Sequence, residues 1–285
     1  MPLSAEDIRS LHRDDLRILH TIERLMRWHQ WVPEDLIRQK TGFSAGEVKY
    51  RAGRLHAKGM VRYDTVPYEG YTLVSTGYDT LALTDLVRRG TVSALGGLIG
   101  EGKEAVVYEA LGVTPLVLKF HHLGERSFRA VRRGREYGDP AHNLPRSEVS
   151  IASAAHEYAA LQHLHPRVNV PLPIAYNRHV VVMALISGLT LNRVRLTSPS
   201  DTLGEILEII RTTYSMGVVH ADLSEFNLMV SDDRCVVIDW PQWVATDHPA
   251  AHAHIVRDIS TVLGYFRKKY RIMYDVSEAV RCVTT

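Results

Sequence analysis

Three polar residues, Asp222, Asn227 and Asp239, stand in an otherwise apolar run that covers residues 217–243. A carboxylate, a carboxamide and a second carboxylate offer the oxygen atoms that Mg²⁺ prefers as ligands. A carboxylate in such a group can also act as the base for a hydroxyl nucleophile. If the three side chains converge, they therefore predict magnesium-assisted chemistry on a hydroxyl group.

A predicted β-hairpin explains how these side chains could meet. Residues 228–230 and 235–238 are apolar, and the turn-forming residues 231–234 separate them. Because the two strands of a hairpin are antiparallel, Asn227 before the first strand is expected to lie close to Asp239 after the second. Asp222 falls in the loop immediately upstream. A buried hairpin with ordinary turn carboxylates is the alternative interpretation of this segment.

A second group of residues, farther upstream, has types that suit phosphate binding. Gly100 and Gly102 interrupt a predicted strand-turn-strand segment and let backbone N–H groups approach a phosphate chain. Lys119 interrupts an apolar strand, and burying a lone ammonium is costly, so a partner acid is required. Glu157, in a predicted helix, is the expected partner. An ordinary turn, a solvent-exposed lysine and a surface glutamate form the alternative reading.

Residues 180–188 read as a buried strand that runs into a joint. The order of these residues resembles that of protein-kinase motifs, and the resemblance implies that this joint is the hinge, where backbone groups of residues 184–186 would contact the adenine edge. Met183 would line the pocket behind it.

The first 90 residues predict several helices followed by a small β-ribbon, which is the element order of a winged helix. Pro33 opens the second helix and Gly42 ends it, while Ser44 caps a third helix that Gly59 stops. The predicted helices cover 16–26, 34–40 and 44–58, and the predicted strands cover 60–63 and 71–74.

The third of these helices is basic. Only Glu47 opposes its positive charges, which is the pattern expected for phosphate contacts of a recognition helix. The alternative interpretations are a solvated helix face and a protein-contact module. The candidate nucleic-acid-binding residues are Lys49, Arg51, Arg54 and Lys58.

Further segments connect or extend these parts. Ser75 or Thr76 is expected to cap a linker helix, after which residues 90–97 form a turn-rich joint. Residues 125–146 contain six arginines, and glycine and proline residues break any long helix there. They predict a mobile basic insertion that could bind RNA phosphates or an acidic protein. A merely solvated loop is the alternative. Near the end of the chain, helices are expected over 202–217 and 247–262, with another beginning at Gly264.

Composition limits the class of protein. The 285 residues and 45% hydrophobic content suit two packed domains, and a net charge of +2 leaves nucleic-acid affinity to local patches. The two cysteines, Cys235 and Cys282, cannot form a disulfide framework, and Cys235 is expected to be a buried thiol. No apolar run of about 18 residues and no signal peptide is visible, so we expect a soluble intracellular protein.

Together these motifs closely resemble the RIO family of atypical protein kinases, specifically its second, winged-helix-bearing subfamily, in an archaeal-type form. The resemblance covers nearly the whole chain. The segments that carry it are Ser75-Thr76-Gly77-Tyr78-Asp79, Gly100-x-Gly102-Lys103-Glu104, Leu118-Lys119-Phe120, Asp222-Leu223-Ser224-x-x-Asn227 and Ile238-Asp239-Trp240-Pro241-Gln242.

The resemblance implies an α+β fold, with an N-terminal winged helix-turn-helix domain followed by a compact bilobal protein-kinase-like domain. The expected parts are a winged-helix domain with its linker helix (1–90), a kinase N-lobe with the basic insertion (91–186) and a reduced kinase C-lobe (187–285). The sequence departs from the family pattern at Ala221, where Gly or Arg is usual, and at Ala184, where an acidic residue is frequent.

The resemblance also implies roles for the site residues. Asp222 would be the catalytic aspartate, assisted by Asn227 and Asp239, which would bind Mg²⁺ or Mn²⁺. ATP would be held by Gly100, Gly102, Lys103, Glu104, Lys119, Glu157, Met183, Ala184 and Ile186.

The implied function is that of a cytoplasmic, monomeric serine/threonine kinase or ATPase without a membrane partner. It would transfer the γ-phosphoryl group of ATP to itself, water or a protein hydroxyl, and would bind immature small ribosomal subunits and their rRNA. Two alternatives stay open: a small-molecule phosphotransferase, and a nucleotide-gated RNA-binding assembly factor without significant catalysis. Against the first, only 46 residues (285 − 239) follow Asp239, few for a substrate-binding region.

Overall fold

A computed structural model describes residues 5–122, 146–231 and 234–285. The chain divides into two compact units. The first comprises residues 1–114, 118–152 and 177–180, and the second comprises 115–117, 153–176 and 181–285. The domain boundaries at 90 and 186 stay a prediction, and all but the last residue of the basic insertion 125–146 lies outside the described residues.

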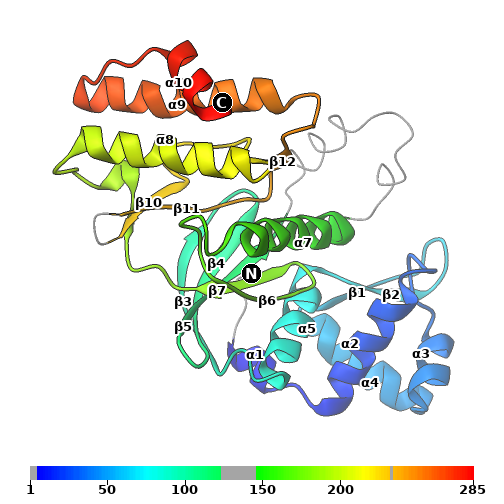
Figure 1. The fold of residues 1–285 in the computed structure, drawn as a ribbon. Coiled ribbons are helices and arrows are strands. Elements are labelled where there is room, and N and C mark those ends of the chain that lie inside the picture. Colours follow the sequence, from blue (N-terminus) through cyan, green and yellow to red (C-terminus); the bar gives the residue numbers. More distant parts are fainter. Residues whose placement is uncertain (1–4, 123–145, 232–233) are drawn as a thin grey trace. The chain divides into compact units, whose positions relative to one another are not determined.

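The first unit begins with the predicted helices and ribbon (Figure 1). Strands β1 and β2 pair antiparallel from Val61 opposite Leu73 to Asp64 opposite Gly70. The predicted winged-helix order is confirmed. Its elements are α1 (Ala5–Arg9), α2 (Arg13–Leu25), α3 (Glu34–Thr41), α4 (Ala45–Ala57), β1 (Val61–Asp64), β2 (Gly70–Leu73) and α5 (Ser75–Arg88).

Local signals set most of these boundaries. Gly42, with φ +73°, ends α3, and the Ser44 side chain accepts a hydrogen bond from the Glu47 N–H at the start of α4. The predicted side-chain cap of α5 is wrong. Ser75 is already the first helical residue, Val74 occupies the N-cap position, and no side chain caps this helix.

A five-stranded sheet follows, with strand order β3-β4-β5-β7-β6. The strand β3 starts earlier than predicted, so the second half of the joint 90–97 is strand rather than turn. Gly96 permits this, because a Cβ there would meet the Cβ of Glu109 on β4 at 3.0 Å. The strands are β3 (Ala94–Glu101), β4 (Ala105–Leu111), β5 (Pro115–His121), β6 (Pro173–Asn177) and β7 (Val180–Ala184).

The turn between β6 and β7 is tied to the helices of the first unit by ion pairs. Arg178 has φ +54° and donates to Asp85 of α5 at 2.8 Å and to Glu23 of α2 at 2.7 Å. Its side chain is largely buried, and the bidentate contact to Glu23 fixes the guanidinium plane. The backbone of this turn is therefore held against α2 and α5.

In the second unit, α8, α9 and α10 lie side by side (Figure 1). The elements are α7 (Arg146–Leu164, from residue 153 on), β8 (Leu189–Thr190), η2 (Leu191–Arg193), α8 (Pro199–Ser215), β9 (Val218–Val219), β10 (Leu228–Ser231), β11 (Arg234–Val237), β12 (Val244–Ala245), α9 (Ala251–Tyr270) and α10 (Val276–Thr284).

The prediction that a new helix begins at Gly264 is wrong, because α9 runs through this residue without a break. The buried residues Ile259, Val262 and Phe266 continue one apolar face on both sides of the glycine. A single glycine in a helix costs about 1 kcal/mol, and burial of that face outweighs it. The helix ends instead at Arg271, with φ +62°.

Each unit has its own core. The first packs Ile18, Leu19, Ile22 and Val48 with neighbouring side chains, while the second is larger and centres on α8, α9 and the hairpin. Cys235 is buried in the second core, as predicted, and burial raises the pKa of its thiol to about 12. None of the described helices is long and apolar enough to cross a membrane.

The glycine in α5 supplies a test of packing within the first unit. A Cβ at Gly77 would meet the Met60 carbonyl oxygen at 2.3 Å, whereas one at Gly53 in α4 would meet nothing within 4 Å. Gly77→Ala is expected to lower the free energy of unfolding by about 2 kcal/mol. Gly53→Ala should raise it by about 0.5–1 kcal/mol. Urea unfolding measures both, and equal midpoints for the two variants would contradict this packing.

Candidate active site

The hairpin of β10 and β11 brings together the polar residues that the sequence singled out. The Ile238 N–H donates to the Asn227 carbonyl oxygen at 3.0 Å, so Asn227 lies beside the residue that precedes Asp239. The Asn227 Nδ2 donates to the Asp222 carbonyl oxygen at 2.8 Å. This bond uses the amide nitrogen and leaves Oδ1 as the Asn227 atom that can bind a cation. The predicted proximity is confirmed.

His220 connects the loop before Asp222 to the residue before Asp239. Its Nδ1 accepts the Asp222 N–H at 3.2 Å, so its Nε2 carries the proton and donates to the Ile238 carbonyl oxygen at 3.1 Å. The imidazole is buried against the indole of Trp240, with ring centroids 4.5 Å apart. Sequence reasoning assigned His220 no such role.

A buried carboxylate from α9 fixes the same loop from another side. Asp258 accepts the N–H groups of Ala221 at 2.8 Å and Leu223 at 3.2 Å, the two residues that flank Asp222. Burial raises the pKa of Asp258 to about 6, although these two hydrogen bonds and Arg257 lower it. The sequence alone did not indicate a role for Asp258. The available signal was one acidic residue next to the buried apolar face of Ile255 and Ile259.

Two non-glycine residues of this site have left-handed backbone conformations: Ala221 with φ +64° and Asp239 with φ +67°. Each costs about 1–2 kcal/mol relative to a right-handed conformation. At Ala221, Asp258 binds the N–H and the Arg257 guanidinium donates to the carbonyl oxygen, so both backbone groups are satisfied. These contacts stabilise a residue at a position where the family pattern usually has Gly or Arg.

The helix α7 holds the segment that follows Asp239. The Trp240 N–H donates to Glu157 Oε1 at 3.0 Å, and Glu157 is only 1% exposed. The neighbouring His156 stacks on Trp243 with centroids 4.5 Å apart, and the Trp243 indole N–H donates to the His156 carbonyl oxygen at 3.0 Å. Glu157 thus orients the backbone next to Asp239, a contact that the sequence did not predict.

The predicted Lys119–Glu157 pair joins residues of different units and stays a prediction. Lys119 is 8% exposed, so the alternative reading with a solvent-exposed lysine and a surface glutamate is wrong. Gly100, Gly102, Lys103 and Glu104 lie where β3 turns into β4, and the Gly102 N–H closes the turn on the Ala105 carbonyl oxygen at 2.9 Å.

The predicted hinge follows β7 in the second unit, and Met183 is buried there. The N–H of Ala184 donates to Leu172 at 3.0 Å, and that of Leu185 donates to Pro115 at 3.1 Å. These two donors are used within the protein. The predicted contacts of this joint with adenine stay a prediction.

The charge pattern of α4 differs from the prediction. The Arg51 guanidinium contacts Asp14 at 3.0 Å and Asp15 at 3.2 Å, both on α2, as well as Glu47. Arg54 contacts Asp15 at 3.3 Å. The statement that only Glu47 opposes these charges is therefore wrong, since acids distant in sequence also do. Lys49 remains exposed, while Lys58 is half-buried.

A protein-kinase catalytic domain combines a carboxylate, a carboxamide and a second carboxylate at a hairpin with a buried lysine in a β-sheet. This chain has Asp222, Asn227 and Asp239 at the β10–β11 hairpin, and the buried Lys119 on β5. Comparison with known families narrows this class. The model of the RIO domain matches residues 106–279, and that of the Rio2 N-terminal domain matches residues 8–89. The chain belongs to the RIO family of kinases, in the branch with the Rio2 N-terminal domain.

Individual relatives agree. The RIO-type serine/threonine-protein kinase Rio2 of Methanocaldococcus jannaschii is 38% identical over 87% of this chain and 93% of that protein. The serine/threonine-protein kinase rio2 of Schizosaccharomyces pombe is 34% identical over 96% and 81%. A crystal structure of the Rio2 kinase-ADP/Mg²⁺-phosphoaspartate complex from Chaetomium thermophilum superposes with a TM-score of 0.85, 27% identity, and coverage of 99% and 90%. The predicted kinase class is confirmed, and ATP and Mg agree with the ligands of that complex.

Asp258 predicts a pH dependence of stability. Its pKa in the folded protein, about 6, is above the ordinary value of 3.8, so the folded state binds this proton more tightly. The free energy of unfolding should therefore fall as pH rises from about 4 to about 6, by at most about 1.4 kcal/mol per pH unit. In Asp258→Asn this carboxyl group is absent, so its pH-dependent contribution to the free energy of unfolding should be lost.

Urea unfolding of parent and Asp258→Asn across this pH range isolates the effect as a difference between two curves. A difference that stays constant with pH would contradict the raised pKa. Asp247→Asn serves as the control because Asp247 is exposed. Its free energy of unfolding should vary with pH in the same way as that of the parent.

Proposed function

We propose that this protein is an ATP-dependent serine/threonine kinase and ATPase that transfers the γ-phosphoryl group to itself, to water or to a protein hydroxyl. The observation that carries the proposal is the junction of Asp222, Asn227 and Asp239 at the open end of the β10–β11 hairpin. The kinases that this chain resembles, and the ADP and Mg²⁺ of the solved relative, support it.

The donor set fits Mg²⁺. Asn227 offers Oδ1, because its nitrogen is bound to the Asp222 carbonyl oxygen, and Asp239 offers a half-buried carboxylate. Both are hard oxygen ligands. When bound, the ion would neutralise phosphate charge and withdraw electrons from the phosphoryl group. Asp222, exposed at the surface of the second unit, would orient the hydroxyl or water that attacks and accept its proton.

The first unit would supply phosphate contacts of its own. Its turn with the exposed Gly100 and Gly102 would approach the phosphate chain together with the side chains of Lys103 and Glu104. The buried Lys119 would neutralise phosphate oxygens. In the second unit, Met183, Ala184 and Ile186 would contact adenine, and Glu157, which already holds the Trp240 N–H, would fix the position of Asp239.

Asp239 is also our candidate for a transient phosphate acceptor. A carboxylate at the metal is a reasonable nucleophile: one oxygen attacks the γ-phosphorus, the bond to the β–γ bridging oxygen breaks, and ADP leaves. Water then cleaves the acyl phosphate and releases inorganic phosphate. The phosphoaspartate in the solved Chaetomium thermophilum relative supports this step.

The acyl phosphate gives a direct test. Incubation with ATP labelled in the γ-phosphate should label the parent, and hydroxylamine, which cleaves acyl phosphates, should release the label. Asp239→Asn should abolish both this label and ATP hydrolysis, whereas Asp247→Asn, an exposed control, should keep them. We expect the parent to hydrolyse ATP slowly and to phosphorylate free peptides poorly. Strong peptide phosphorylation with no acyl phosphate would overturn the mechanism.

We further propose that the protein acts on immature small ribosomal subunits in the cytoplasm and contacts their rRNA. The resemblance to the RIO family implies this role, and the basic helix α4 supports it. Lys49 is exposed there, whereas Arg51 is held by Asp14 and Asp15 and is better explained as a structural residue. A small-molecule phosphotransferase is disfavoured, because the Rio2 N-terminal match covers residues 8–89, a part that such an enzyme leaves unexplained.

Charge reversal at Lys49 tests the RNA contact. Lys49→Glu should weaken binding to small-subunit precursor RNA and reduce the slope of log affinity against log salt by about one. Lys40→Glu, an equally exposed change on α3, serves as the control and should leave the slope unchanged. Filter binding at several salt concentrations measures both. If Lys49→Glu binds like the parent, α4 is not an RNA-contacting helix.

A further inference from the structure

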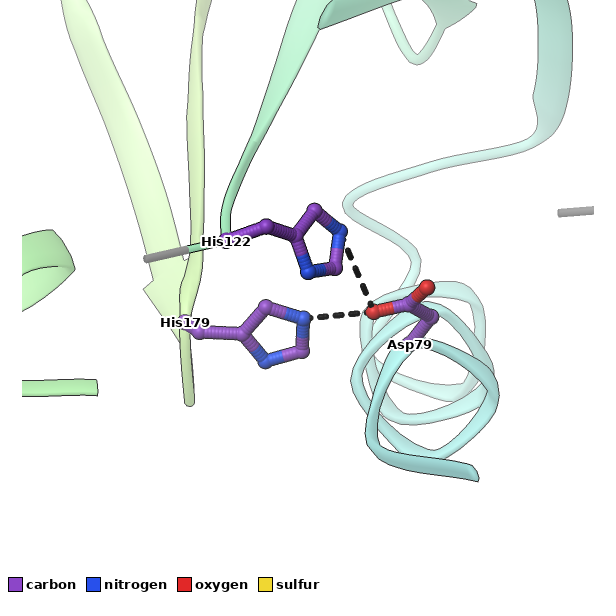
Figure 2. A group of neighbouring side chains, drawn as sticks. All are labelled: Asp79, His122 and His179. Atoms are coloured by element: carbon purple, nitrogen blue, oxygen red, sulfur yellow. Dashed lines mark hydrogen bonds and ion pairs between the residues drawn. The ribbon is translucent and has the colours of Figure 1, made fainter. Parts of the chain in front are cut away.

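Outside the candidate active site, three side chains of the first unit direct nitrogen and oxygen atoms toward one point. Asp79 lies on α5, His122 directly follows β5, and His179 lies in the turn between β6 and β7. One donor atom from each lies within 4.8 Å of the others. Figure 2 shows both imidazole rings turned toward the same carboxylate.

The two histidines approach one oxygen atom of the carboxylate. His179 Nε2 is 2.7 Å from Asp79 Oδ1, and His122 Nε2 is 3.6 Å from it. Asp79 and His179 are buried, while the His122 side chain is 31% exposed. Asp79 and His179 therefore form the buried side of the cluster, and an ion can enter from the partly exposed side at His122.

The backbone and the aromatic neighbours restrain both rings. The His121 N–H donates to the His179 carbonyl oxygen at 2.8 Å, and the His122 N–H donates to the Glu104 carbonyl oxygen at 2.7 Å. The Phe120 ring lies parallel to His122 at 6.4 Å and edge-on to His179 at 6.0 Å. The donor atoms are therefore held by strand pairing and ring packing rather than by long flexible side chains.

Burial lowers the pKa of His122, while the Asp79 carboxylate raises it and His179 and His121 lower it. A metal ion binds the neutral form of histidine, and the Asp79 carboxylate supplies a negative charge.

We propose that Asp79, His122 and His179 bind a divalent transition-metal ion, with Zn²⁺ as the preferred ion. Two imidazole nitrogens and one carboxylate oxygen are typical zinc ligands, and water would complete a tetrahedron. Each histidine would bind through Nε2 and keep its proton on Nδ1. Mg²⁺ prefers oxygen ligands and would not compete well here. The site is independent of the proposed phosphoryl transfer.

The two separations that involve Asp79 require only a small rearrangement, and the donor atoms of the two histidines lie within 4.8 Å of each other. Zinc bonds of about 2.0–2.1 Å place tetrahedral ligand atoms about 3.3 Å apart. The separation of 3.6 Å between His122 and Asp79 is already close to this value. The pair at 2.7 Å would open by about 0.6 Å as the ion replaces the hydrogen bond. An ion at this point would link α5 to the end of β5 and to the turn between β6 and β7.

Co²⁺ is a suitable probe, because a four-coordinate site with nitrogen ligands absorbs visible light far more strongly than a six-coordinate oxygen site. The full-length chain, in an Asp239→Asn background with excess Mg²⁺, is titrated with Co²⁺ and then with Zn²⁺. We expect a strong absorption that saturates at one equivalent and disappears when Zn²⁺ is added. Zn²⁺ should also raise the melting temperature.

Two variants decide whether this cluster is the site. Asp79→Asn keeps an oxygen that accepts a hydrogen bond from His179, and His122→Gln changes a partly exposed residue, so both should fold; circular dichroism checks this. Each should lose the Co²⁺ absorption and the thermal stabilisation, while His252→Gln, an exposed control on α9, should keep both. A parent without the absorption, or variants that retain it, would overturn the proposal and leave an ordinary buried Asp–His hydrogen bond.

Discussion

The geometry of the candidate active site depends on one buried carboxylate, that of Asp258. It accepts the backbone N–H groups on both sides of Asp222, so it fixes the path of the loop without using any side chain of the loop itself. With Arg257 at the carbonyl oxygen, it also stabilises the left-handed Ala221. A carboxylate taken out of water is costly, as its raised pKa shows, and these hydrogen bonds offset part of that cost.

The other contacts of the site follow the same principle. His220 joins the loop to the Ile238 carbonyl oxygen, and Glu157 receives the N–H of Trp240. Backbone atoms on each side of Asp239 are thereby fixed by buried polar side chains. Because the supporting bonds go to the backbone, they fix the loop and the segment around Asp239 without using the carboxylates of Asp222 and Asp239. This is the preorganisation that phosphoryl transfer requires.

Charge has a double role in the first unit. The arginines of α4 looked like a surface for nucleic acid, yet Arg51 and Arg54 are paired with acids of α2 and hold two helices of the winged helix together. The ion pairs of Arg178 with Glu23 and Asp85 similarly fix the turn between β6 and β7. Removing one partner of such a partly buried ion pair lowers the free energy of unfolding more than removing one partner of an exposed pair.

The sequence by itself determined the features that depend on neighbouring residues. The end of α3 at Gly42, the start of α4 after Ser44, the β10–β11 hairpin and the proximity of Asn227 to Asp239 were all predicted, because turns, caps and hairpins act over a few residues. The order of the motifs also indicated the kinase class, which the family matches confirmed.

The tertiary structure alone decided the contacts between distant segments. Asp258 binds a loop that precedes it by 35 to 37 residues, Arg51 binds acids 36 and 37 residues upstream, and His179 meets Asp79 across 100 residues. Composition and periodicity carry no information on such partners. The continuity of α9 through Gly264 also depends on tertiary packing. Contacts of α9 with the second core stabilise the helix at this position despite the glycine.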